Sequence, residues 1–535
     1  MGSGAGAAVA STTAGLLRYW AAVSPGHTAL RRDADQLDYA GLDARSNQVA
    51  QALLASGVGP GDRVAYLDKN SLEQVELYFG AVKVGAVPTP INYRLAPPEI
   101  AYIVADAGAK VLAVGSELLP AVEAVEDDLA VATLLVIGNE VAGGRHTYAG
   151  WRDAFPPDDP QLPIEASDVA YQMYSSGTTG RPKGVLLTHA NLVAEIAAVS
   201  DIGRFGPGAV SLVAMPLFHI GGGGYLLGGL AHGATNVLVR DIVPADLVET
   251  FEAERVTHCF VVPAVIQAML GVPGVADRDF SSLQRLVYGA SPISERVLAD
   301  ALRTFGAPLV QVYGLTETTG AVVYLPPEDH DPDGPRKHRL RSAGLPVAGV
   351  ELRVVDPTTG VGLPTGEVGE VWVRAPMVMQ GYWHLPDATS EAIAEGGWLR
   401  TGDLGHLDAD GYLYLYDRLK DMIVSGGENI YPAEVENVLM SHPAVADAAV
   451  IGVPDERWGE RPLAILVRRP SGDPGAGGPG AGDDELLAWC RARLAGFKCP
   501  DRLVWVDALP RNPSGKVLRT HLRTPYWQGR ARRVG

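Results

Sequence analysis

Hydrophobic and polar positions along the chain form two patterns, one typical of helices and one typical of buried strands. Apolar residues recur at helical spacing in residues 37–53 and 73–84. Short apolar runs, typical of buried strands, lie at residues 63–67, 111–114, 133–137, 258–263, 285–289 and 309–314. Because strands and helices of these lengths alternate, we expect α/β sheets with crossover connections.

The pattern changes after about Ala343. Short segments that alternate in polarity lie between glycine-rich turns at residues 351–355, 369–374 and 411–416. They predict a small β-barrel-like unit. After Asp417 we expect a compact α+β region with helices near 433–440 and 485–495 and strands near 446–452 and 462–467. A chain of 535 residues is too long for one compact core, so two or more domains are expected.

Residues 205–239 contain no Lys, Arg, Asp or Glu and are numerous enough to cross a bilayer. Pro207, Pro216, His219 and His232 interrupt this segment, and residues 221–224 are all glycine. Such residues favour a buried strand, a loop and a short packed helix over a lipid-facing span. We therefore expect no transmembrane segment, although a hydrophobic substrate leaves peripheral membrane contact open.

Composition narrows the class of protein. Lys and Arg number 44 against 62 Asp and Glu, a net charge of −18, which argues against non-specific binding to nucleic acid. Cys259, Cys490 and Cys499 form neither a disulfide framework nor a CxxC metal motif, so a reducing cytoplasm is expected. The first ten residues lack the basic and apolar regions of a secretory signal and are expected to form a flexible tail.

Candidate chemistry begins with residues 174–185, which read YSSGTTGRPKGV. Glycines and hydroxyl side chains let such a loop surround a polyphosphate with backbone N–H groups, and Lys183 adds a positive charge. It is not a Walker A loop, because Pro182 and Gly184 flank the lysine. Apolar residues on both sides predict that the loop joins two strands. A plain surface turn is the alternative.

Further motifs follow in order along the chain: MPLFH at 215–219, YGASP at 288–292, YGLTET at 313–318, WLRTGD at 398–403 and PRNPSGKV at 510–517. YGASP and YGLTET come at the ends of the predicted strands 285–289 and 309–314, where the sites of α/β proteins occur. Residues 475–480 satisfy GxGxxG, but they contain Pro479 and follow no strand, so they indicate a flexible insertion rather than a dinucleotide site.

Taken together, these motifs resemble the adenylate-forming superfamily of acyl-CoA synthetases, adenylation domains and firefly-type luciferases, from about Tyr39 to about Arg523. The chain looks most like bacterial fatty-acyl-CoA ligases. The resemblance implies a large N-terminal domain, residues 1–416, with two α/β sheet subdomains and the barrel-like subdomain. A hinge at 417–421 and a small mobile α+β domain at 422–535 follow.

The resemblance also implies roles for single residues. ATP or AMP would be bound by Ser175, Ser176, Gly177, Thr178, Thr179, Gly180, Lys183, Gly289, Ala290, Ser291, Tyr313, Gly314, Thr316, Asp403 and Arg418. Glu317 would hold Mg²⁺, since a hard cation prefers carboxylate oxygen. The implied catalytic residues are Lys516, Lys183, Glu317, Thr316 and His219.

For the step that uses CoA, the resemblance implies two further sets of residues. Lys420 matches the hinge position, and CoA would contact Gly426, Gly427, Trp458 and Phe497. The acyl pocket would include His219, Gly222, Gly223 and Gly314, although these glycines suit close backbone packing equally well. Trp458 and Phe497 fit packed aromatic positions too.

The implied reaction joins a carboxylic acid to CoA through an acyl-adenylate. ATP is consumed, Mg²⁺ is the metal ion that it requires, and AMP and pyrophosphate are released. We expect a medium- or long-chain fatty acid, with an aryl or polycyclic acid as the alternative. Transfer to an amine or a carrier protein, a luciferase-like oxidation and a homodimer also stay open. A catalytically inactive regulator is disfavoured because Lys183, Glu317, Asp403 and Lys516 are all present.

Overall fold

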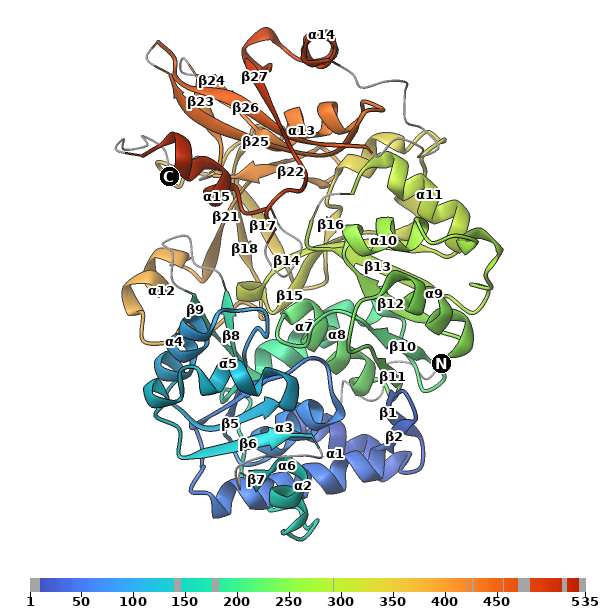
Figure 1. The fold of residues 1–535 in the computed structure, drawn as a ribbon, viewed down its shortest axis with the longest axis vertical. Coiled ribbons are helices and arrows are strands. Elements are labelled where there is room, and N and C mark those ends of the chain that lie inside the picture. Colours follow the sequence, from blue (N-terminus) through green and yellow to red (C-terminus); the bar gives the residue numbers. More distant parts are fainter. Residues whose placement is uncertain are drawn as a thin grey trace.

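The structure is a computed structural model that describes residues 10–138, 146–175, 182–291, 293–419, 421–425, 428–455, 457–469, 482–511 and 517–528. These residues form five sheets (Figure 1). The first nine residues and the GxGxxG motif of residues 475–480 lie outside the described part.

The first sheet, at the bottom of Figure 1, is parallel, with the order β4-β3-β5-β6-β7. Its strands are β3 (Arg63–Leu67), β4 (Val87–Pro90), β5 (Ala109–Gly115), β6 (Thr133–Ile137) and β7 (His146–Thr147). Its helices are α2 (Tyr39–Ala55), α3 (Leu72–Lys83), α4 (Pro97–Ala107), α5 (Leu119–Glu123) and α6 (Tyr148–Asp153). Val64 and Tyr66 pack in one core, and Ala65 and Leu67 in another, so both faces of the sheet are covered.

The second sheet has nine strands in the order β16-β15-β14-β13-β12-β10-β11-β1-β2. Its strands are β1 (Thr28–Arg32), β2 (Asp35–Asp38), β10 (Val210–Val213), β11 (Thr235–Leu238), β12 (His258–Val261), β13 (Arg285–Gly289), β14 (Leu309–Leu315), β15 (Gly320–Leu325) and β16 (Leu345–Pro346). The associated helices are α1 (Thr13–Val23), α7 (His189–Gly203), α8 (Ile220–Ala231), α9 (Pro244–Ala253), α10 (Pro263–Leu270) and α11 (Glu295–Phe305). Strand β1 pairs in parallel with β11, which joins the start of the chain to this sheet.

Two antiparallel sheets complete the larger part of the molecule. Strands β8 (Val169–Ser175) and β9 (Lys183–Thr188) flank the glycine-rich loop, as predicted, and β19 (Gly381–Tyr382) pairs with β9. The region expected to be barrel-like is a five-stranded antiparallel sheet. It consists of β17 (Glu351–Val355), β18 (Gly369–Arg374), β20 (Ile393–Ala394), β21 (Trp398–Leu407) and β22 (Leu413–Arg418), with α12 (Pro386–Ala392) beside it.

The smaller C-terminal part, at the top of Figure 1, is built on one mixed sheet in the order β24-β23-β26-β25, with β27 parallel to β26. The strands are β23 (Ile423–Ser425), β24 (Glu428–Ile430), β25 (Val445–Asp455), β26 (Gly459–Arg468) and β27 (Arg502–Val506). Helices α13 (Pro432–Met440) and α14 (Asp483–Arg491) contribute to one core, and α15 (Arg519–Arg523) to a second. The predicted fold class, a large α/β part followed by a small α+β part, is confirmed.

The apolar segment at residues 205–239 forms β10, α8 and β11, so it is core, as the proline and glycine pattern predicts. Among the described residues, no helix is long and apolar enough to cross a membrane. Helix α8 includes all four consecutive glycines, although glycine costs about 1 kcal/mol in a helix relative to alanine. Burial of Leu226, Leu227 and Leu230 helps to offset that cost.

Candidate active site

The carboxylate of Glu317 lies where three separate segments meet. Strand β14 runs into a short 3₁₀ helix, Thr316–Thr318, which carries Glu317. Its Oε1 accepts hydrogen bonds from Ser175 Oγ at 3.0 Å and from Tyr382 Oη at 3.1 Å. Thr318 Oγ1 accepts a hydrogen bond from Leu315 N at 2.8 Å and so shapes this turn. The predicted metal ligand and the start of the glycine-rich loop are therefore neighbours.

Lys183 lies on the other side of the same loop. It is the first residue of β9 and pairs in register with Ser175, the last residue of β8. Its Nζ lies 4.9 Å from the centroid of the Tyr382 ring, within cation–π distance. Ser176, Gly177, Thr178, Thr179 and Gly180 lie outside the described residues. The two ends of the predicted phosphate loop thus carry one hydroxyl and one ammonium group beside Glu317.

The residues around Glu317 fit a magnesium ion that is shared with phosphates. Both hydrogen bonds reach Oε1, and within the described part of the chain none reaches Oε2, so that oxygen is available to a cation. The same part holds no cluster of three or more His, Cys, Asp or Glu suited to a metal. Mg²⁺ is commonly held by one or two carboxylates together with substrate phosphates and water. A single carboxylate beside a phosphate loop meets that requirement.

Asp403, one of the residues predicted to bind ATP or AMP, is directly linked to Tyr313. Tyr313 Oη donates a hydrogen bond of 2.6 Å to Asp403 Oδ2. The backbone around Asp403 is held by two side chains: Asp403 N donates to Thr401 Oγ1, and Gly402 N donates to Glu370 Oε1. Arg418 pairs with Asp403 in the β21–β22 ladder, but its side chain lies outside the description. Two motifs 90 residues apart are thus joined.

The turn from Gly289 to Ser291, predicted to bind ATP or AMP, follows β13 at the edge where β14 also ends. A Cβ on Gly289 would lie 2.3 Å from Val312 O, and one on Gly314 only 1.7 Å from Gly320 O. Both positions therefore require glycine for backbone packing. Ala290 has a φ of 66°, which reverses the chain direction here. Polar residues at the carboxyl ends of neighbouring parallel strands are the usual place of a ligand site in such sheets.

His219 precedes α8 and is neutral at physiological pH. Burial, with a smaller contribution from Arg94, lowers the pKa of its imidazole to about 4. Its Nε2 is buried and has no hydrogen-bond partner among the described residues. The Phe218 ring lies 4.4 Å away, centroid to centroid. A neutral imidazole with an unsatisfied nitrogen can exchange a hydrogen bond with a ligand without adding charge.

Gly222 and Gly223, predicted to line the acyl pocket, belong to the buried side of α8. A Cβ on Gly222 would lie 2.2 Å from Pro216 O, and one on Gly223 would lie 3.0 Å from Leu217 O. Close packing therefore accounts for both glycines, and an acyl contact stays a prediction. Gly223 also lines a cavity of about 10 Å³ within the core.

The partly exposed positions of α8 are different ones: Ile220, Gly221 and Tyr225. A Cβ on Gly221 would lie 2.9 Å from the Phe260 ring, and the Tyr225 and Phe260 rings are 5.9 Å apart. The sequence interpretation missed this group and also Tyr382. The spacing of Gly221 and Tyr225, one helical turn apart, could have indicated a shared face, whereas nothing local marks Tyr382.

Comparison with known proteins agrees with this geometry. The profile of the AMP-binding enzyme family matches residues 17–383, and that of the AMP-binding enzyme C-terminal domain matches residues 434–516. The chain belongs to this family. It is an AMP-forming enzyme of the acyl-CoA synthetase type, an adenylate-forming ligase, for which ATP and CoA are the fitting co-substrates and Mg²⁺ the typical ion.

Three relatives illustrate the range of the family. The chain is 41% identical over 503 residues, 93% of each chain, to the fatty acid–[acyl-carrier-protein] ligase ScoC of Streptomyces coeruleorubidus. It is 41% identical over 510 residues, 95% of this chain and 97% of the other, to a feruloyl-CoA synthase of an Amycolatopsis species. Among solved structures, the anthranilate CoA ligase AuaEII in complex with anthranoyl-AMP is similar, with a TM-score of 0.86, 30% identity and coverage of 96% and 97%.

Four further predicted site residues lie outside the described part: the hinge residue Lys420, the CoA-side residues Gly426 and Gly427, and the catalytic Lys516. The two aromatic residues predicted to contact CoA are described and accessible. Trp458 is 40% exposed and Phe497 is 38% exposed. The Arg457 guanidinium lies 4.6 Å from the Trp458 ring, and Lys498 Nζ lies 5.8 Å from the Phe497 ring. Exposed rings beside cationic groups suit an anionic aromatic ligand.

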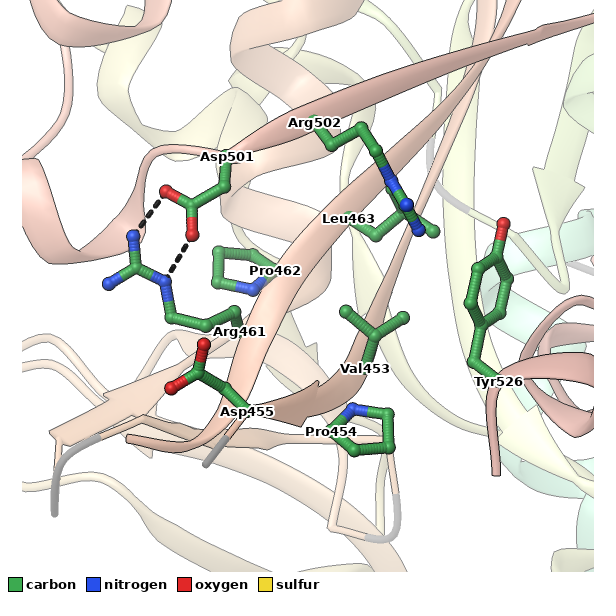
Figure 2. A pocket seen from close by; sticks show the side chains of 9 residues that line it. All are labelled: Val453, Pro454, Asp455, Arg461, Pro462, Leu463, Asp501, Arg502 and Tyr526. Atoms are coloured by element: carbon green, nitrogen blue, oxygen red, sulfur yellow. Dashed lines mark hydrogen bonds and ion pairs between the residues drawn. The ribbon is translucent and has the colours of Figure 1, made fainter. Parts of the chain in front are cut away.

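A pocket of about 490 Å³ opens in the C-terminal part, apart from the ATP motifs (Figure 2). Its lining residues are Val453, Pro454, Asp455, Arg461, Pro462, Leu463, Asp501, Arg502 and Tyr526. Figure 2 shows two hydrogen bonds between Arg461 and Asp501 at one side and the Tyr526 ring at the other. In sequence the pocket residues lie on both sides of Trp458 and shortly after Phe497, although neither ring lines the pocket.

Proposed function

We propose that the enzyme converts a medium- or long-chain fatty acid to its acyl-CoA through an acyl-adenylate, with release of AMP and pyrophosphate. The observation that carries this proposal is the meeting of Ser175, Lys183 and Glu317 at the glycine-rich loop. The Tyr313–Asp403 hydrogen bond adds a group suited to ribose hydroxyls. Together these groups match the phosphates, metal ion and sugar of Mg·ATP.

In the first half-reaction, a carboxylate oxygen of the acid attacks the α-phosphorus of ATP, and the bond from that phosphorus to the bridging oxygen breaks, so pyrophosphate leaves. The predicted loop 175–180 and Lys183 hold the phosphates, and Thr316 contacts them. A magnesium ion held by Glu317 would neutralise phosphate charge. His219 borders the carboxylate as a neutral imidazole, and Lys516 supplies positive charge where the oxyanions meet.

In the second half-reaction, the C-terminal domain, residues 422–535, rotates about Lys420 relative to residues 1–416. This motion withdraws Lys516 and brings Gly426 and Gly427 to line the path of the pantetheine arm. The CoA thiol loses its proton and attacks the acyl carbon, and the bond from that carbon to AMP oxygen breaks. Trp458 and Phe497 contact the CoA nucleotide. The use of one cleft for both steps explains a catalytic lysine on a hinged domain.

An aryl acid is the second candidate substrate, favoured by the aromatic side chains beside the partly exposed positions of α8. Phe260 and Tyr225 border Gly221 there, and flat rings stack favourably on aromatic walls. One 41% identical relative is a feruloyl-CoA synthase, whereas another is a fatty acid ligase. The latter joins a fatty acid to an acyl carrier protein, so a carrier protein is an alternative to CoA as the acceptor of the acyl group.

A pyrophosphate-release assay with fatty acids of graded length and a panel of aryl acids tests the proposal. We expect release with ATP and Mg²⁺, highest kcat/KM for medium or long fatty acids, and thioester with CoA. Production of ADP and phosphate would contradict the proposed cleavage. Higher kcat/KM for aryl acids, or transfer only to a carrier protein or an amine, would select one of the alternatives.

We also propose that the enzyme works in the cytoplasm, and a homodimer stays open. All three cysteines are free and buried, which suits a reducing compartment. Light scattering of the purified chain tests the dimer: the mass of one chain, 56.4 kDa, would contradict it.

A further inference from the structure

Two backbone contacts join the residues on either side of positions 512–516, which include Lys516 and lie outside the described part. Arg511 and Val517 form an antiparallel bridge, and Leu518 N donates a hydrogen bond of 2.8 Å to Pro510 O. Helix α15 begins directly afterwards, at Arg519. Arg519 is three residues from Lys516, so their Cα atoms can be separated by no more than about 11 Å.

Arg519 makes a buried contact with helix α13 through one nitrogen of its guanidinium group. Its Nη2 donates to Glu436 Oε1 at 2.9 Å and to Oε2 at 2.8 Å. The side chains of Arg519 and Glu436 are only 14% and 10% exposed. Glu436 Oε1 also accepts a hydrogen bond of 2.7 Å from Val450 N in β25. The carboxylate is thus fixed by two elements, and the planar guanidinium can meet it in few orientations.

The same arginine approaches Asp421, the first residue after the predicted pivot Lys420. Arg519 Nη1 lies 3.8 Å from Asp421 Oδ2, and Arg523 Nη1 lies 3.4 Å from Asp421 Oδ1. Asp421 is buried. Two carboxylates and two guanidinium groups, here termed the Arg519 cluster (Asp421, Glu436, Arg519 and Arg523), therefore connect the start of the C-terminal part, helix α13 and helix α15.

We propose that Arg519 is a positioning residue that holds the Lys516 segment in register with the pivot, so that rotation about Lys420 is transmitted to Lys516. This inference rests on the proposed function, in which Lys516 acts in adenylation only. Lysine has a long flexible stem, so the place of its ammonium group depends on where the backbone is held. Misplacement of a catalytic group by 1 Å can cost about 100-fold in rate.

A purely structural role for the Arg519 cluster would have a different signature. Loss of the cluster would then destabilise the whole C-terminal part and lower both half-reactions together. A positioning role requires that only adenylation suffers and that the loss disappears when Lys516 is already absent.

The test compares Arg519→Met with Arg519→Lys, each assayed for adenylation by pyrophosphate exchange and for thioester formation from supplied acyl-AMP and CoA. We expect Arg519→Met to lower adenylation by about 10- to 100-fold and to change thioester formation by less than about threefold. Arg519→Lys keeps the charge but has a single nitrogen in place of the two that approach Glu436 and Asp421, so its loss should be smaller than that of Arg519→Met. Glu436→Gln is a milder second variant with the same expected pattern should Arg519→Met unfold.

Arg278→Met is the matched control, because Arg278 also forms an ion pair with a glutamate, Glu252 at 2.9 Å, but both side chains are exposed, at 45% and 42%. We expect both of its half-reactions to stay within about threefold of the parent enzyme. In a Lys516→Ala background, Arg519→Met should cause no further loss of adenylation. A further loss there, or parallel losses in both half-reactions, would overturn the inference and leave the proposed function intact. Full adenylation by Lys516→Ala would refute the role of Lys516 and this inference with it.

Discussion

Glu195 is a buried carboxyl group beside Gly320 and Ala321 at the start of β15, a strand that begins shortly after Glu317 in the chain. It lies in α7, and a Cβ on Gly320 would be 2.6 Å from its Oε1. Burial raises the pKa of Glu195 to about 8, although a hydrogen bond from the Ala321 backbone N–H acts in the opposite direction. At neutral pH this side chain is therefore mostly protonated. Glu195→Gln replaces it with a neutral group of the same shape.

The magnitude follows from the difference between the folded and unfolded pKa. The folded value is raised from 4.5 to about 8, so the contribution to stability is fully present below pH 4.5 and is lost as the pH rises through 8. One pKa unit corresponds to 1.36 kcal/mol, so ionisation of Glu195 removes up to roughly 5 kcal/mol of unfolding free energy across that window. Glutamine cannot ionise and avoids this loss.

Urea unfolding of both proteins at about pH 5 and about pH 9 measures the effect. The free energy of unfolding should fall between these pH values by about 2–5 kcal/mol more in the parent than in Glu195→Gln, because Glu195 ionises only in the parent. Glu249→Gln, on the exposed side of α9, is the matched control and should follow the parent curve. Parallel curves for the parent and Glu195→Gln would refute the argument from burial.

Three shorter predictions concern the candidate site. Tyr313→Phe removes the 2.6 Å hydrogen bond to Asp403, and since bonds to charged groups contribute about 1.5–3 kcal/mol, the KM for ATP should rise by about 10- to 100-fold. An unchanged KM would show that the Tyr313–Asp403 hydrogen bond does not contribute to binding of the ATP ribose. Because the pKa of His219 is lowered to about 4, kcat/KM should show no histidine titration between pH 6 and pH 8, and one that disappears in His219→Gln would contradict its neutral state. Gly314→Ala would bring Cβ within 1.7 Å of Gly320 O, so the melting temperature and adenylation should both fall, and normal values of both would show that the strands can separate at little cost.

Much of the fold follows from local pattern in the sequence. The two strands around the glycine-rich loop, the parallel strands at 285–289 and 309–314, and the change to antiparallel sheet after Ala343 were all predictable. Periods of 2 and 3.6 residues arise from backbone geometry within one element, and a sequence displays them directly. The order of the motifs, through the resemblance that they carry, also selected the candidate site residues, whose roles stay predictions.

The tertiary structure alone decided which distant residues meet. Tyr382 reaches Glu317 across 65 residues, and no local spacing predicts this contact. Helix α8 continues through four glycines because its buried side packs closely, with Gly222 against Pro216 O, although local propensity favours a break. Hence sequence period determines what each element is. Which elements pack against each other depends on shape and burial across the whole fold, and only the assembled core determines these.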